Sequence, residues 1–348
     1  MPVTRKWARR WIVGALSLAL SLTVQPAFAG GSRGAGGATE SDPTEPSGPK
    51  DTLYATAIHF DESNNGGNKS ATPMTSVSNW TPPACWYEPK WSPAEFKDEF
   101  QRRWDIPHAS GVGEAHSLDQ DHYIKGKPYK DFNKSETGKG MWWDAVRDKK
   151  REEAGDPAAF ECDTATFWVK NGVTPKVKNA VTPEILSQLA YNKIKVPDTK
   201  VTLAPADATK VNLPTWAWLD KVEFKPVSVT AALNAGGLNI QATTTATPVS
   251  LRLEPGTDEA TTFPASGECP INHGRIGEPY ANGKADVTPP CGVEYLRSSG
   301  DGTYKLRATV TWEIHWIGTG VSKEQSLPDG EFGATQDVTV QEIQAINR

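Results

Sequence analysis

The clearest pattern of apolar and polar residues lies near the C-terminal end. Between Tyr304 and Trp316, seven apolar residues alternate with six polar ones. A period of two is typical of a strand with one face on a core and the other in water. Further β-branched runs separated by Pro and Gly predict strands at residues 201–203, 226–233, 239–247, 250–253 and 337–343. Several short strands at this spacing favour an all-β sandwich over residues 196–348.

The stretch 51–195 mixes strand and helix patterns. Residues 53–60 alternate as a strand does, and a second strand is expected at 165–170. Helices are expected from Met141 to Glu153 and from Thr182 onward, where Pro183 takes the first helical position. This stretch is therefore predicted to be an α+β region.

One helix start in this region has a specific signature. Ser92-Pro93-Ala94-Glu95 combines an N-cap serine, a proline at the first helical position and a glutamate at the third. Phe96, Phe100 and Trp104 then recur four apart, so they share one face of the predicted helix.

The N-terminus has the pattern of an export signal. Basic residues from Arg5 to Arg10 precede an apolar run at 11–24, and Ala27-Phe28-Ala29 offers small residues for cleavage. We expect a signal peptide over 1–29, cleaved after Ala29, then a disordered Gly/Ser/Pro linker over 30–50. Arg9-Arg10 leaves both the general secretory and the twin-arginine routes open. No later apolar run has membrane length, so a secreted, extracellular protein without a membrane span is expected.

Four cysteines remain after this cleavage site, at Cys85, Cys162, Cys269 and Cys291. An even number in an exported chain predicts two disulfides. The change of composition near residue 195 leaves two cysteines on each side, which favours Cys85 with Cys162 and Cys269 with Cys291. No two cysteines are close neighbours, so a zinc site is disfavoured.

Five short segments from residue 212 onward resemble a secreted actinobacterial family with a domain similar to the polycystic-kidney-disease (PKD) repeat. They are Leu213-Pro214-Thr215-Trp216-Ala217-Trp218-Leu219, Thr245-Ala246-Thr247-Pro248, Cys291-Gly292-Val293-Glu294-Tyr295, Thr309-Val310-Thr311-Trp312 and Val340-Gln341-Glu342-Ile343-Gln344. The resemblance implies an immunoglobulin-like β-sandwich and an extracellular protein, with no established reaction. Glu254-Pro255-Gly256 stands where PKD-like domains carry an aromatic-x-Gly-Asp-Gly turn, so that turn is not implied.

Charge and glycine pattern disfavour two functional classes. The net charge is -5, so no basic surplus is present for a phosphate backbone, and nucleic-acid binding is not expected. Gly111-Val112-Gly113 is a lone Gly-x-Gly without the strand and helix that a nucleotide-binding loop needs, and no cofactor is expected.

A metal site is one candidate chemistry. His116, Asp119, Asp121 and His122 lie close together in a stretch that also contains His108. Imidazoles and carboxylates are zinc and calcium ligands. Their spacing matches neither a His-Glu-x-x-His helix nor a calcium loop, so a hydrated polar loop is the competing interpretation.

The thirteen tryptophans suggest a second candidate, an aromatic surface for sugar rings. Adjacent tryptophans on a helix cannot both face one core, so one of Trp142 and Trp143 is expected to be partly exposed. The predicted ligand face contains Trp86, Tyr87, Trp91, Trp142 and Trp143.

These patterns favour a non-enzymatic exported protein that binds, adheres to or scaffolds the cell envelope, with an envelope polymer or protein as partner. No catalytic residues are nominated. The alternative is a secreted hydrolase of envelope or environmental polymers with its site in the N-terminal region. A hydrolase requires a cleft with converging acids or a metal, whereas a binding module requires only an exposed aromatic or polar face.

Overall fold

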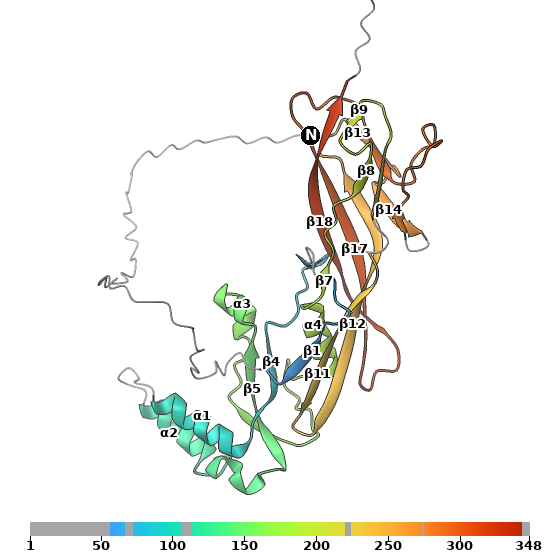
Figure 1. Ribbon diagram of the computed structural model, residues 1–348. Coiled ribbons are helices and arrows are strands. Elements are labelled where there is room, and N and C mark those ends of the chain that lie inside the picture. The colour runs from blue at the N-terminus through green and yellow to red at the C-terminus, as the bar shows by residue number, and fades with distance from the viewer. Residues whose placement is uncertain (1–55, 67–71, 106–112, 220–223, 273–274, 343–348) are drawn as a thin grey trace, which may run out of the picture. The chain divides into compact units, whose positions relative to one another are not determined.

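The computed structural model describes residues 56–66, 72–105, 113–219, 224–272 and 275–342 (Figure 1). The expected signal peptide and linker, and His108, lie outside these residues. All the described residues belong to one compact unit. Antiparallel β-strands are the main regular structure of the described chain. None of the described helices is long and apolar enough to cross a membrane.

Three long antiparallel strands dominate the large sheet. They are β12 (Leu238–Glu254), β17 (Tyr304–Gly318) and β18 (Gln325–Gln341), which lie side by side in Figure 1. The alternation predicted for β17 is confirmed, because Leu306, Val310 and Ile314 are buried while Arg307 and Glu313 are exposed. The two strands expected at 239–247 and 250–253 form the single strand β12, with a register shift between Pro248 and Ser250.

The large sheet continues along the edge of β12 that lies opposite β17. β11 (Val227–Ala235) pairs with its first half and β14 (Glu268–Asn272) with its second half. From β14 the order runs through β15 (Arg275–Gly277), β10 (Thr215–Leu219), β16 (Gly292–Tyr295) and β13 (Ala260–Phe263). β8 (Thr202–Ala204) pairs with β10, and β9 (Ala208–Lys210) runs parallel to β18.

A disulfide between Cys269 and Cys291 joins β14 to the residue just before β16, which is the pairing expected from the sequence. The two cysteines are 22 residues apart, and both are buried. Their bond restricts the unfolded chain, so the double variant Cys269→Ala, Cys291→Ala is expected to lose about 3 kcal/mol of stability. Urea unfolding at equilibrium measures this loss. An unchanged midpoint would mean that the crosslink does not restrict the unfolded chain.

Elements from before residue 195 are part of the large sheet and its core. β1 (Ile58–Asp61) pairs with β11, and β3 (Thr75–Ser76) pairs with β18. Helix α4 (Pro183–Tyr191) packs on β11 and β12, where the Thr244 hydroxyl donates to the Ser187 carbonyl at 2.8 Å. β2 (Thr72–Pro73) pairs with β7 (Lys195–Val196). The change of composition near residue 195 is therefore not a break in packing.

A separate three-stranded sheet consists of β4 (Cys85–Trp91), β5 (Gly140–Arg147) and β6 (Phe167–Lys170). The remaining described elements are α1 (Pro93–Asp105), α2 (Gly113–Tyr123), α3 (Lys149–Glu153) and the short 3-10 helices at Asp131–Glu136 and Pro157–Phe160. The expected disulfide between Cys85 and Cys162 ties β4 to the segment before β6.

The predicted start of α1 is confirmed. The Ser92 backbone N–H donates to the Glu95 carboxylate at 2.7 Å, and the Glu95 N–H donates to the Ser92 hydroxyl at 3.3 Å. These reciprocal bonds are a capping box, which stabilises the first turn. Phe96 and Phe100 are buried behind it, as expected.

The helix expected from Met141 to Glu153 is wrong. Residues 140–147 form strand β5, and only 149–153 are helical. Trp142 and Val146 share a face at a spacing of four, but positions four apart share a face in a strand as well as in a helix. The spacing therefore could not distinguish the two structures.

Candidate functional site

The four residues nominated as metal ligands lie on α2, not in a loop. Successive helical residues point about 100° apart, so neighbouring side chains diverge. His116 stacks on Trp104 with ring centroids 4.4 Å apart, and the Asp121 carboxylate pairs with Lys125 at 2.9 Å. His122 packs edge-on against Tyr123. Within the described residues no group of three or more His, Cys, Asp or Glu could hold a metal ion, which contradicts a centre at these four residues.

The predicted aromatic ligand face is also contradicted. Trp142 and Trp143 are 0% and 1% exposed, and Trp86 and Tyr87 are buried as well. Trp91 alone of the five is partly exposed. Because β5 is a strand, Trp142 and Trp143 point to opposite faces of the sheet, and each meets its own core.

One cavity of about 310 Å³ lies beside these residues. It is bounded by α1, the end of α2, β5 and the segment that follows Cys162. Its lining includes Phe96, Phe100, Arg103, Trp104, Asp119, Tyr123, Asp144, Arg147, Cys162 and residues 163–166. We call it the Arg103 pocket.

Carboxylates hold the guanidinium of Arg103 at one side of this pocket. Its Nη2 lies 2.9 Å from Asp144 Oδ2, and its Nε lies 2.8 Å from Glu99 Oε1. Glu99 also pairs with Arg102 at 2.7 Å. Burial opposes ionisation of Glu99, but the hydrogen bonds from both arginines hold its pKa below the ordinary value. A guanidinium held by two carboxylates therefore borders the pocket.

Asp119 also lines this pocket, but its pKa is shifted in the opposite direction to that of Glu99. Burial raises the pKa of Asp119, and the charge of Arg103 and a hydrogen bond from Trp104 offset this only in part. Burial also raises the pKa of Tyr123, whose hydroxyl donates to the Thr166 carbonyl at 3.0 Å. A cluster of perturbed groups around a cavity is typical of a functional site.

Sequence reasoning nominated Asp119 but missed Arg103, Glu99 and Asp144. A usable signal was present, because Glu99 and Arg103 are four apart on the predicted helix and can therefore pair. Asp144 lacked such a signal, since it was assigned to a helix and lies on a strand.

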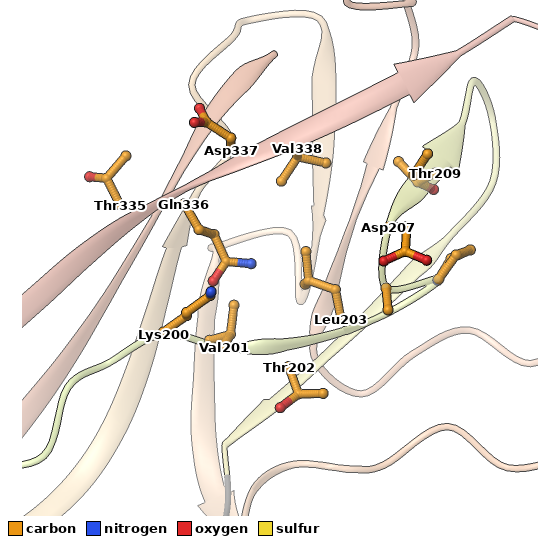
Figure 2. Close-up of a pocket in the computed structure, with 13 residues that line it drawn as sticks. Lys200, Val201, Thr202, Leu203, Asp207, Thr209, Thr335, Gln336, Asp337 and Val338 are labelled. Carbon is orange, nitrogen blue, oxygen red and sulfur yellow. The ribbon is translucent and has the colours of Figure 1, made fainter. Parts of the chain in front are cut away.

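A second, larger groove of about 620 Å³ runs between β8, β9 and β18 (Figure 2). Leu203 and Val338 face it from opposite strands, with Lys200 and Gln336 towards one end. Asp337 is engaged by Lys305 and by the Thr303 hydroxyl, which donates at 2.8 Å. The groove thus has aliphatic and hydroxyl walls, and it lacks the aromatic rings and convergent ionic network of the Arg103 pocket.

Comparison with protein-family models, with curated proteins and with solved structures found no match. Functional inference for this chain therefore depends on its own residues.

Proposed function

We propose that the protein is an exported, non-enzymatic binding protein that holds a sugar unit of a cell-envelope polymer in the Arg103 pocket. The observation that carries this proposal is the composition of one cavity. The indole of Trp104 and the ring of Phe100 line it together with Arg103, Asp119 and Asp144. Aromatic faces stack on the C–H faces of sugar rings, while guanidinium and carboxyl groups bind their hydroxyls.

Export is supported by the N-terminal pattern and by the two disulfides, since such bonds persist in oxidising compartments. The β-rich C-terminal half is compatible with the PKD-like, immunoglobulin-like sandwich that the sequence resembles. We include that resemblance in the proposal. In such an arrangement the sheet acts as a rigid support for the sugar site.

A hydrolase acting on the same polymer is the second candidate, and one observation favours it. Asp119, whose pKa is raised by burial, lines the same cavity as Asp144, which is held by Arg103. A buried acid whose pKa is raised can serve as general acid in glycoside cleavage, and a second carboxyl group in the same cavity can serve as base or nucleophile. Binding and hydrolysis then differ in whether soluble sugar is released.

The test is retention of the mature protein on insoluble envelope polysaccharide. Trp104→Ala removes a stacking surface, so its retention is expected to fall at least tenfold, or about 1.4 kcal/mol. Tyr280→Ala is the matched control, because Tyr280 is an exposed aromatic outside the pocket, and its retention should equal that of the wild type. Thermal unfolding of each variant confirms that it is folded.

Asp119→Asn separates the two candidates, because it preserves shape and cannot donate an acidic proton. Released sugar that disappears in this variant would support the hydrolase and overturn the binding proposal. Wild-type retention by Trp104→Ala would show that the pocket is not the sugar site.

A further inference from the structure

A third cavity, of about 530 Å³, lies where the small sheet meets the large one. Arg147 at the end of β5 lines both this cavity and the Arg103 pocket, so the two are neighbours. Its lining includes Arg147, Lys149, Lys150, Lys193 and Lys195. We call it the lysine cavity.

The charge of the lysine cavity is opposite to that of the whole chain. Five of its lining side chains are cationic and two are carboxylates, in a chain of net charge -5. A local surplus of positive charge within concave walls attracts and orients anions.

The carboxylates at the cavity are already engaged. Glu62 lies 3.7 Å from Lys195. Asp148 accepts from the Arg151 backbone N–H at 3.1 Å, and from the Asn192 side-chain amide at 3.3 Å. Two further lining cations are paired as well, Arg147 with Glu152 at 2.8 Å and Lys149 with Glu153 at 3.9 Å, which leaves Lys150 and Lys193.

Lys150 and Lys193 have no ion pair with a carboxylate in the part of the chain that the structure describes. Both are exposed, and the Lys193 ammonium lies 5.3 Å from the centre of the Phe60 ring. Like charges gathered at one opening repel each other unless an anion joins them. These two lysines thus have the charge and the access to receive an anionic ligand.

The floor of the cavity is apolar. Trp86, Leu189 and Ile194 also line it, and each of them is buried. A ligand that fits both parts has a carbon skeleton for the floor and negative groups for the rim, as in a sugar or polyol polymer that carries phosphate or carboxylate groups.

We infer that the lysine cavity binds an anionic group of the polymer whose neighbouring sugar occupies the Arg103 pocket. This inference rests on the proposed function, and it specifies the substrate class as an acidic polymer. Phosphate and carboxylate share the required charge.

Binding of the mature protein to three defined probes tests the inference: poly(glycerol phosphate), polygalacturonate and neutral dextran. The variant Lys150→Gln, Lys193→Gln is compared with Lys225→Gln, Lys323→Gln. The control pair removes the same charge from two exposed lysines outside the cavity. The cavity variant is expected to bind at least one acidic probe at least tenfold more weakly at low salt, whereas the control variant is expected to keep wild-type affinity.

The salt dependence gives an independent readout. Loss of two ion contacts should flatten the fall of affinity with ionic strength, because fewer counterions are exchanged. The acidic probe with the larger loss identifies the source as phosphate or carboxylate. Equal losses in both double variants, or no loss in either, would overturn the inference.

Trp104→Ala distinguishes failure of this inference from failure of the proposed function. Binding that weakens in the lysine variant but not in Trp104→Ala would support the cationic site and contradict the sugar pocket. Binding that weakens in Trp104→Ala but not in either lysine variant would support the sugar pocket and contradict the cationic site.

Discussion

Replacing either Trp142 or Trp143 by alanine is expected to lower the free energy of unfolding by about 3–5 kcal/mol. Both side chains are essentially inaccessible to water. Trp142 packs 4.5 Å from the Phe96 ring and donates its indole N–H to the Phe132 carbonyl at 3.1 Å. Trp143 lies on the opposite face of β5, in the core shared with α4. Each truncation therefore leaves a cavity in a different core.

Urea unfolding monitored by circular dichroism measures both losses. Because the two residues face separate cores, the double variant should lose most of the stability of a typical domain and fail to fold. Phe160→Ala is the control, since Phe160 is 49% exposed and its loss should cost far less. A double variant with the wild-type midpoint would contradict the placement of these tryptophans in the core.

The burial of Trp142 and Trp143 determines which variants can test ligand binding. A fall in retention after truncation of Trp142 and Trp143 would report unfolding and not a lost ligand contact. Trp104 is the better probe, because it is partly exposed and lines a cavity.

The sequence predicted those parts of the fold that depend on local chemistry. The capping box at Ser92 requires only four consecutive residues, and the alternation in β17 requires only its own side chains. The N-cap at Thr182 belongs to the same class, since its hydroxyl accepts from the Ile185 N–H at 3.2 Å. Information within one element was sufficient in each case.

The errors arose where a decision depended on distant partners. β5 is a strand because β4 and β6 pair with it on both sides, and those partners lie tens of residues away. The expected interruption of β12 near Pro248 is absorbed as a register shift, because β17 pairs with both halves.

The candidate site shows the same limit. Arg103, Asp119 and Asp144 come from three elements, and their convergence follows from the packing of α1 and α2 on the small sheet. The sequence contained the residues of the Arg103 pocket and of the lysine cavity, but their proximity exists only in the folded chain.

Glu88 is the most buried acidic residue of the small sheet. A substitution there is expected to cause the other large loss of stability. Glu88 is 0% exposed. Its carboxyl group accepts three hydrogen bonds: from the Ala57 N–H at 2.5 Å, the Thr56 hydroxyl at 2.7 Å and the Trp86 indole N–H at 2.7 Å. One acid thus links β4 to the residues just before β1.

Glu88→Ala is expected to destabilise the protein by about 4 kcal/mol. The change leaves the N–H groups of Ala57 and Trp86 without an acceptor, at about 1–3 kcal/mol for each buried donor, and it opens a small cavity. Equilibrium urea unfolding measures the loss. Glu95→Ala provides a control for loss of an exposed carboxylate, and its removal of one capping bond should cost about 1 kcal/mol.

The pH dependence of stability tests the state of Glu88 directly. Burial raises the pKa of Glu88 above its ordinary value of 4.5, although the three hydrogen bonds and the charge of Lys90 act in the opposite direction. The folded state therefore holds this proton more tightly than the unfolded state. The contribution of Glu88 to stability should be complete below pH 4.5 and should decrease as the pH rises through the folded pKa.

Glu88→Gln cannot titrate, so the difference in stability between wild type and this variant should vary across that range. A constant difference would show that Glu88 has the same proton affinity in the folded and unfolded chains.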